Sequence, residues 1–134
     1  MFKNFNEFSF NVIDVVPRGM ADMLISKNGL TVSRGAVDEM GYPAYVRMLV
    51  DGENKVFAIQ TCKIGDENAV RFSSPKAEQT KPVYCMVRNI RTIIFGIMAD
   101  QWKEEESYRI KGVYFKESNA MVFNLKSAVL RSKK

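Results

Sequence analysis

Apolar and polar residues alternate in several short segments of the first third of the chain. Residues 8–12 place Phe or Val at every second position, which predicts a strand with one buried face. Two further short apolar segments, 23–25 and 30–32, are strand candidates. Between them stand Asn28 and Gly29, a pair that favours a tight hairpin turn because both residues tolerate positive φ. We therefore expect one strand followed by a two-stranded hairpin.

A short helix and a second hairpin are expected next. Ser33 is a good N-cap for a helix that ends near Met40, and Gly41 is a typical C-terminal stop. Residues 45–50 and 55–61 then predict two strands of a hairpin. Both faces of the first of these strands are largely apolar, so we expect it to be central in its sheet.

A polar stretch separates this half of the chain from the next apolar pattern. Residues 65–82 contain two prolines and one short apolar island, and we assign 68–82 as a connector. Beyond it, apolar residues recur at spacings of three and four, which predicts an amphipathic helix of about 16 residues. The residues of this stripe are Met86, Val87, Ile90, Ile93, Ile94, Ile97 and Met98.

The last apolar segments predict a third hairpin, formed by residues 108–115 and 120–125 around a polar turn. The remaining residues, 126–134, end in basic side chains, and we expect them to fray. In the predicted organisation, a helix followed by a hairpin thus occurs twice along the chain. Residues 56–59 and 122–125 are also similar, which duplication or chance resemblance between amphipathic strands would explain.

The predicted fold class is α+β: a mostly antiparallel sheet with two helix-then-hairpin units, one with a short helix and one with a long amphipathic helix. Residues 1–67 form the strand, short-helix and hairpin half, and residues 83–134 form the long-helix and hairpin half. The 68–82 connector joins them. At 134 residues, we expect both halves to pack as one domain.

The composition excludes most enzyme classes. The chain has no histidine, which rules out Ser-His-Asp and Cys-His catalysis, and Cys62 and Cys85 cannot by themselves complete a zinc site. No Gly-rich phosphate loop or nucleophile elbow occurs. We therefore expect no enzyme activity, no cofactor, no metal and no small-molecule substrate. Free, buried thiols and the lack of any signal peptide or apolar run of about 20 residues predict a cytoplasmic protein without a membrane partner.

The net charge of +5 is unevenly distributed. Residues 1–67 hold 7 basic and 9 acidic side chains, whereas residues 68–134 hold 13 and 6. A polyanion site is therefore expected in the second half. Its candidate residues are Arg71, Lys76, Lys81, Arg88 and Arg91, of which the last two share a predicted helix face. A merely solvated helix face is the alternative explanation of the same charges.

Aromatic residues offer a second possible nucleic-acid surface. Tyr108, Tyr114 and Phe115 lie near Arg109 and Lys111 in the final hairpin. On one face of a sheet such residues can form a platform on which single-stranded bases stack. Aromatic residues at alternating strand positions are also common in protein cores, so both interpretations remain open.

The order of elements in residues 22–62 is strand, Gly-containing turn, strand, capped short helix and hairpin. This segment resembles the AbrB/MazE type of swapped-hairpin DNA-binding domain. The resemblance implies an intertwined homodimer and DNA contact by Lys27, in the turn, and Arg34, at the start of the helix. Leu30 stands where the family usually has a basic residue, and Ser33 where it usually has proline.

Together these features favour a small, non-enzymatic, cytoplasmic DNA-binding protein, a homo-oligomeric transcription regulator that contacts phosphates and grooves. Its predicted contact residues are Lys27, Arg34, Arg71, Lys76, Lys81, Arg88 and Arg91. The alternative hypothesis is a protein-interaction or assembly module that does not bind nucleic acid.

Overall fold

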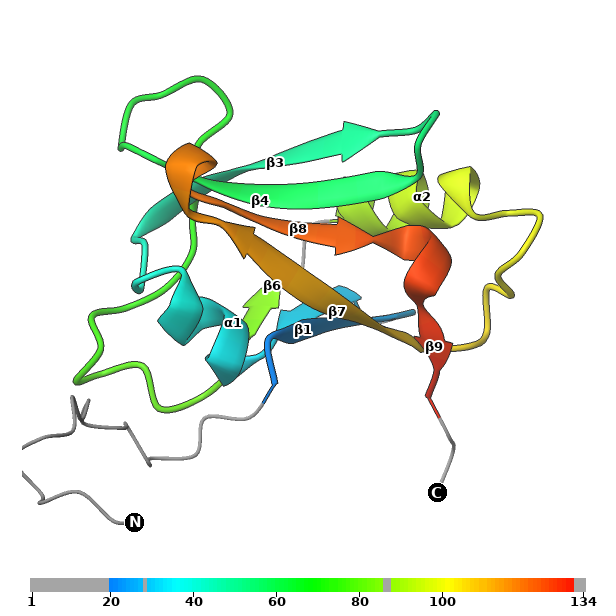
Figure 1. Ribbon diagram of the computed structural model, residues 1–134, viewed down its shortest axis with the longest axis horizontal. Helices are drawn as coiled ribbons and strands as arrows, with labels where there is room; N and C mark the ends of the chain where they lie inside the picture. The colour runs from blue at the N-terminus through cyan, green and yellow to red at the C-terminus, as the bar shows by residue number, and fades with distance from the viewer. Residues whose placement is uncertain (1–19, 28, 86–87, 132–134) are drawn as a thin grey trace, which may run out of the picture.

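The computed structural model describes residues 20–27, 29–85 and 88–131. The predicted strand at residues 8–12 and the turn residue Asn28 lie outside this part of the chain. The α-helices and strands are β1 (Asp22–Ser26), β2 (Gly29–Val32), α1 (Arg34–Glu39), β3 (Tyr45–Asp51), β4 (Val56–Cys62), β5 (Val70–Arg71), β6 (Val83–Cys85), α2 (Arg88–Ile97), β7 (Tyr108–Phe115), β8 (Ala120–Asn124) and β9 (Val129–Leu130) (Figure 1).

The described strands form one antiparallel sheet that curls into a half-barrel. Its order is β5-β3-β4-β8-β7-β1-β2-β6, and β9 also pairs with β7. Figure 1 shows β7 crossing the molecule between β8 and β1, so that this strand joins the two sides of the sheet. The predicted α+β class with a mostly antiparallel sheet is confirmed.

The first helix begins and ends as the sequence predicts. The Ser33 hydroxyl accepts a hydrogen bond from Ala36 N at 3.2 Å, and Met40 is the C-cap. Gly41 follows with φ at +81°, the left-handed conformation that glycine adopts without strain. Ala36 and Val37 are fully buried, so one turn of helix is enough to anchor this segment to the core.

The second helix is shorter than the spacing of apolar residues predicts. It spans 10 residues from Arg88, and Val83–Cys85 forms β6. Met86 and Val87, the first two residues of the predicted stripe, lie outside the described residues. The physical reason for β6 is the open edge of β2: Leu30, Thr31 and Val32 pair with β6, which satisfies backbone groups that the edge would otherwise leave unpaired. The expected helix of about 16 residues is therefore wrong in length.

The first strand of the second hairpin is not central. One edge of β3 pairs with all of β4, but the other pairs only at Tyr45 and Val46 with the two-residue β5. Leu49 and Val50 are apolar but exposed, so their character does not reflect burial. The connector, in turn, supplies β5 and the buried residues Phe72 and Ser73.

The final hairpin forms as predicted, but residues 126–131 do not fray. Val129 pairs with Arg109 and Leu130 with Tyr108, and Arg131 N donates to Ser107 O at 2.9 Å. The chain can return to β7 here because β8 covers only the second half of that strand. The expectation of a frayed end is thus wrong for these residues.

Strand pairings link the first and second halves of the chain, and the two halves have a similar order of elements. In chain order, β1-β2-α1-β3-β4 corresponds to β5-β6-α2-β7-β8. β1 of the first unit pairs with β7 of the second, and β5 of the second pairs with β3 of the first. The pairs β2·β6 and β4·β8 join equivalent strands, and Phe57 stands opposite Phe123 in the latter.

Candidate nucleic-acid interface

The outer face of the sheet presents a straight row of side chains across five strands. Cross-strand register places these residues side by side, each directly opposite the next. In order from β6 to β9 they are Tyr84, Thr31, Leu24, Arg109 and Val129. Alternation explains why this face is open: Met23, Ile25 and Ile110, which neighbour Leu24 and Arg109 along the chain, point inward and are fully buried.

A hollow of about 580 Å³ lies at the β9 end of this row. β7 supplies Arg109 and Lys111, the start of β1 supplies Met20 and Asp22, and the C-terminal segment supplies most of the rest. The residues from the C-terminal segment are Ser127, Val129, Leu130 and Arg131. The C-terminal segment, which the sequence predicts to fray, is therefore one wall of this hollow.

A second hollow of about 320 Å³ continues the first toward β6. The two hollows share Met20, Asp22 and Arg109. The second adds Leu24, Thr31, Ser33 and Pro82. Because they share these residues, the two hollows adjoin on the outer face, and we call them together the outer track.

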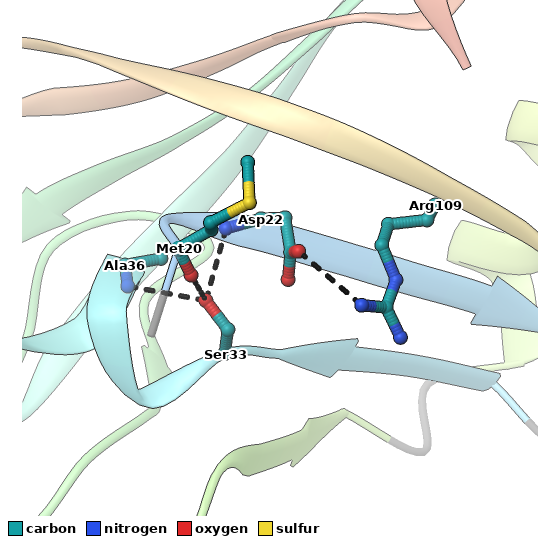
Figure 2. Close-up of polar contacts among 5 residues, drawn as sticks. All are labelled: Met20, Asp22, Ser33, Ala36 and Arg109. Carbon is teal, nitrogen blue, oxygen red and sulfur yellow. Dashed lines mark hydrogen bonds and ion pairs between the residues drawn. The ribbon is translucent and has the colours of Figure 1, made fainter. Parts of the chain in front are cut away.

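Ser33 fixes one side of the outer track. Its hydroxyl accepts a hydrogen bond from Asp22 N at 2.9 Å and donates one to Met20 O at 2.7 Å, in addition to capping α1 (Figure 2). One side chain thereby joins the start of β1 to the start of α1. Figure 2 also shows the Asp22 carboxylate turned toward the Arg109 guanidinium, with Oδ2 and Nη1 3.7 Å apart.

Positive charge dominates the lining of the outer track. Arg109, Lys111 and Arg131 line it, and Asp22 is the only carboxylate among the lining residues. Lys126, in the adjoining turn, is exposed as well. This balance suits an anionic ligand, and the surrounding apolar side chains lower the local dielectric at which the charges act.

Two of the sequence-predicted residues flank the outer track. Arg34 follows Ser33, and Lys81 precedes Pro82, so each stands one position from a lining residue. Both side chains are exposed. They extend the distribution of positive charge toward the β2 and β6 end of the row.

The remaining predicted residues do not line it. Lys27 is in the β1–β2 turn, and Lys76 is in the turn after β5. Arg71 is exposed on β5, with its guanidinium 5.9 Å from the centre of the Tyr45 ring. Arg88 begins α2, and its side chain is outside the described part. The six predicted residues whose side chains the structure describes therefore do not gather into one site.

Arg91 is not an open cation on a solvated helix face. Its Nε donates to Ser26 O at 2.9 Å and its Nη2 to Glu104 O at 2.8 Å. The guanidinium also lies over the Phe95 ring, 4.2 Å from its centre. Arg91 thus holds the β1–β2 turn and the loop before β7 against α2, which corrects the prediction that it shares an exposed face with Arg88.

Of the three aromatic residues of the predicted platform, only Phe115 is exposed, whereas Tyr114 is partly buried and packs against the core. Tyr108 is buried and stacks on Trp102 with ring centres 4.3 Å apart, so it belongs to the core. Arg109, Lys111 and Phe115 do lie on the outer face of β7. Arg109 and Lys111 were recognised from the sequence as neighbours of aromatic residues but not as contact residues. The sequence signal that could have identified Arg109 and Lys111 as surface residues is their alternation with buried residues along β7.

Cys62 and Cys85 are free, as expected, but only partly buried, and burial raises the pKa of the Cys85 thiol to about 11. Across the described segments, no group of three potential metal ligands occurs.

Neither described helix has the length and apolar character that crossing a bilayer requires.

Comparison of the chain with models of known protein families, with curated proteins and with solved structures yields no match. The functional argument therefore rests on the geometry of the outer track.

Proposed function

We propose that this protein binds nucleic acid through the outer track. The observation that carries the proposal is the cluster of Arg109, Lys111 and Arg131 in one depression, with a single carboxylate beside them. Arginine and lysine side chains of this kind supply most of the contacts that proteins make with phosphate oxygens. Arg34 and Lys81 extend the charge at the other end of the track.

The proposal assigns roles to individual side chains. Arg109 lies between Leu24 and Val129 in the cross-strand row and offers a planar guanidinium that matches phosphate geometry. Lys111 lies two positions further along the same strand face, and Arg131 faces it from the C-terminal wall. Neutralising three to five phosphates predicts a slope of log K against log salt of about −2 to −4.5, depending on the strand form.

Charge reversal tests the proposal. Binding of fluorescein-labelled DNA, single-stranded and duplex, is measured by anisotropy at low salt for the wild type and for Arg109→Glu. The matched control is Arg47→Glu on β3, since Arg47 is also an exposed arginine on the outer face but is not part of the track. The proposal predicts loss of binding for the first variant and retention for the second. Absence of wild-type binding to either DNA form rejects it.

A second candidate function is assembly with another copy of the chain. It is favoured by an apolar cross-strand row further along the outer face, made of Leu49, Ala58, Val122 and Val113. Leu49 and Val113 are exposed, as is Phe115 nearby. Sedimentation of the wild type and of Val113→Lys distinguishes this candidate: assembly through this row predicts an oligomer that the substitution dissociates.

A further inference from the structure

Large apolar side chains are exposed along the outer track, between its cations. Met20 is 62% exposed, Leu130 52% and Val129 67%. They line the same hollow as Arg109 and Arg131. A purely polyanionic partner would leave these apolar surfaces in water, so the lining fits a ligand that carries both negative charge and flat apolar faces.

Single-stranded nucleic acid has this combination and a duplex does not. The bases of a duplex are stacked inside, and its surface offers phosphates, sugars and base edges. The unstacked bases of a single strand instead expose their faces to apolar and aromatic side chains. The track is also a hollow bordered by Ser127, Val129, Leu130 and Arg131, and a concave site of this kind admits a strand more readily than the broad cylinder of a double helix.

Tyr84 is the aromatic residue placed to receive a base. It is 61% exposed and begins the cross-strand row that passes through Thr31 and Leu24 to Arg109. Three strand spacings separate Tyr84 from Arg109, about 14 Å. An exposed tyrosine ring stacks on bases irrespective of their identity.

Resting on the proposed function, we infer that the outer track holds a single strand of nucleic acid, with its phosphates on Arg109, Lys111 and Arg131. One base of this strand stacks on Tyr84, which stands opposite the lining residue Thr31 at the β6 end of the track. The strand runs across the sheet, from β6 toward β9. Recognition of this kind is tolerant of sequence because it uses base faces and phosphates.

The test compares labelled oligothymidine of about 16 nucleotides with the same strand annealed to its complement, at one salt concentration. We expect the single strand to bind about tenfold more tightly. Tyr84→Ala should weaken single-strand binding by about fivefold or more, and Tyr84→Phe should preserve it because stacking uses the ring. Phe115→Ala is the matched control, an exposed aromatic residue outside the track whose loss should leave binding unchanged.

The experiment distinguishes failure of the single-strand inference from failure of the proposed nucleic-acid binding. Equal or tighter duplex binding overturns the single-strand assignment and leaves the proposed function intact, whereas no binding to either form removes both. Equal loss of binding in Tyr84→Phe and Tyr84→Ala, or in Phe115→Ala and Tyr84→Ala, overturns the stacking role of Tyr84. Displacement of the oligonucleotide by polyglutamate of equal charge, at equal concentration, shows that the track selects an acidic chain and overturns the inference. Thermal melting of each variant shows whether a loss of binding accompanies a loss of folding.

Discussion

Asp22 and Arg109 form an ion pair on neighbouring strands of the outer face, with Oδ2 and Nη1 3.7 Å apart. The register places Asp22 opposite Lys111 and Leu24 opposite Arg109, so the contact between carboxylate and guanidinium is diagonal. Arg109 is largely exposed, and the pair therefore adds little to stability. The pair instead affects binding, because the Asp22 carboxylate competes with a phosphate for contact with the Arg109 guanidinium.

Replacing Asp22 with asparagine should strengthen nucleic-acid binding. The substitution removes the one carboxylate of the track and releases Arg109, and we expect a gain in affinity of about two- to fivefold at low salt. Glu53→Gln, in the turn between β3 and β4, removes the same charge away from the track and serves as the control. Anisotropy titrations measure both, and an equal gain in the two variants would attribute the effect to net charge alone.

Arg91→Ala should destabilise the fold without a specific effect on binding. The substitution removes two hydrogen bonds to backbone carbonyls and the contact with the Phe95 ring, for a loss of about 2 kcal/mol in the free energy of unfolding. Arg91→Lys should recover only part of it, since an ammonium cannot reproduce the guanidinium fork. Urea unfolding gives the stabilities, and DNA affinity is measured on the folded protein. A large loss of DNA affinity with unchanged stability would show that Arg91 contributes directly to binding.

Gly112 should tolerate no side chain. It lies where β7 passes from pairing with β1 to pairing with β8, and a Cβ there would be 2.7 Å from Met121 Sδ and 2.8 Å from Phe123 Cε1. We expect Gly112→Ala to cost about 1–3 kcal/mol. Gly96→Ala is the matched control: nothing lies within 4 Å of its Cβ position in α2, and we expect a gain of about 0.5–1 kcal/mol. Equal melting temperatures for the two variants would contradict the close packing at β7.

The Cys85 thiol should make stability fall at alkaline pH. Burial raises its pKa to about 11 from the ordinary 9.0, so between these values the unfolded state loses the proton and the folded state keeps it. Ionisation then favours the unfolded state, and the free energy of unfolding decreases as pH rises from 9 to 11. Urea unfolding of the wild type and of Cys85→Ala across this range isolates the contribution, because other groups titrate in both proteins. Parallel pH profiles would show that Cys85 does not contribute.

Local sequence signals account for much of the fold. Ser33 and Gly41 mark the ends of α1, and the alternation from Tyr108 onward marks β7 because these signals act over a few residues. Strand pairing is not local. Val83–Cys85 is a short segment before the predicted helix stripe, and it forms β6 by pairing with β2. Val129 and Leu130 similarly gain structure from β7.

The candidate site could not be predicted from the sequence for the same reason, because it depends on strand pairing between distant segments. Its residues come from segments around 20–33, 82–84, 109–111 and 127–131, and these meet only through the pairings of β6, β2, β1, β7 and β9. Charge counts favoured the run from Arg71 to Arg91, where basic residues are dense along the chain. Arg91 is instead directed to carbonyl oxygens, a role that depends on the position of the β1–β2 turn against α2.

The most direct test of the central claim is a map of backbone amide chemical shifts during titration of the isotope-labelled protein with a short oligothymidine. Binding in the outer track predicts the largest shifts at Asp22, Leu24, Arg109, Lys111 and Arg131, with further shifts at Thr31 and Tyr84. Shifts confined to Leu49, Val113 and Phe115, or to residues 71–81, would contradict the account, as would a titration that moves no amide.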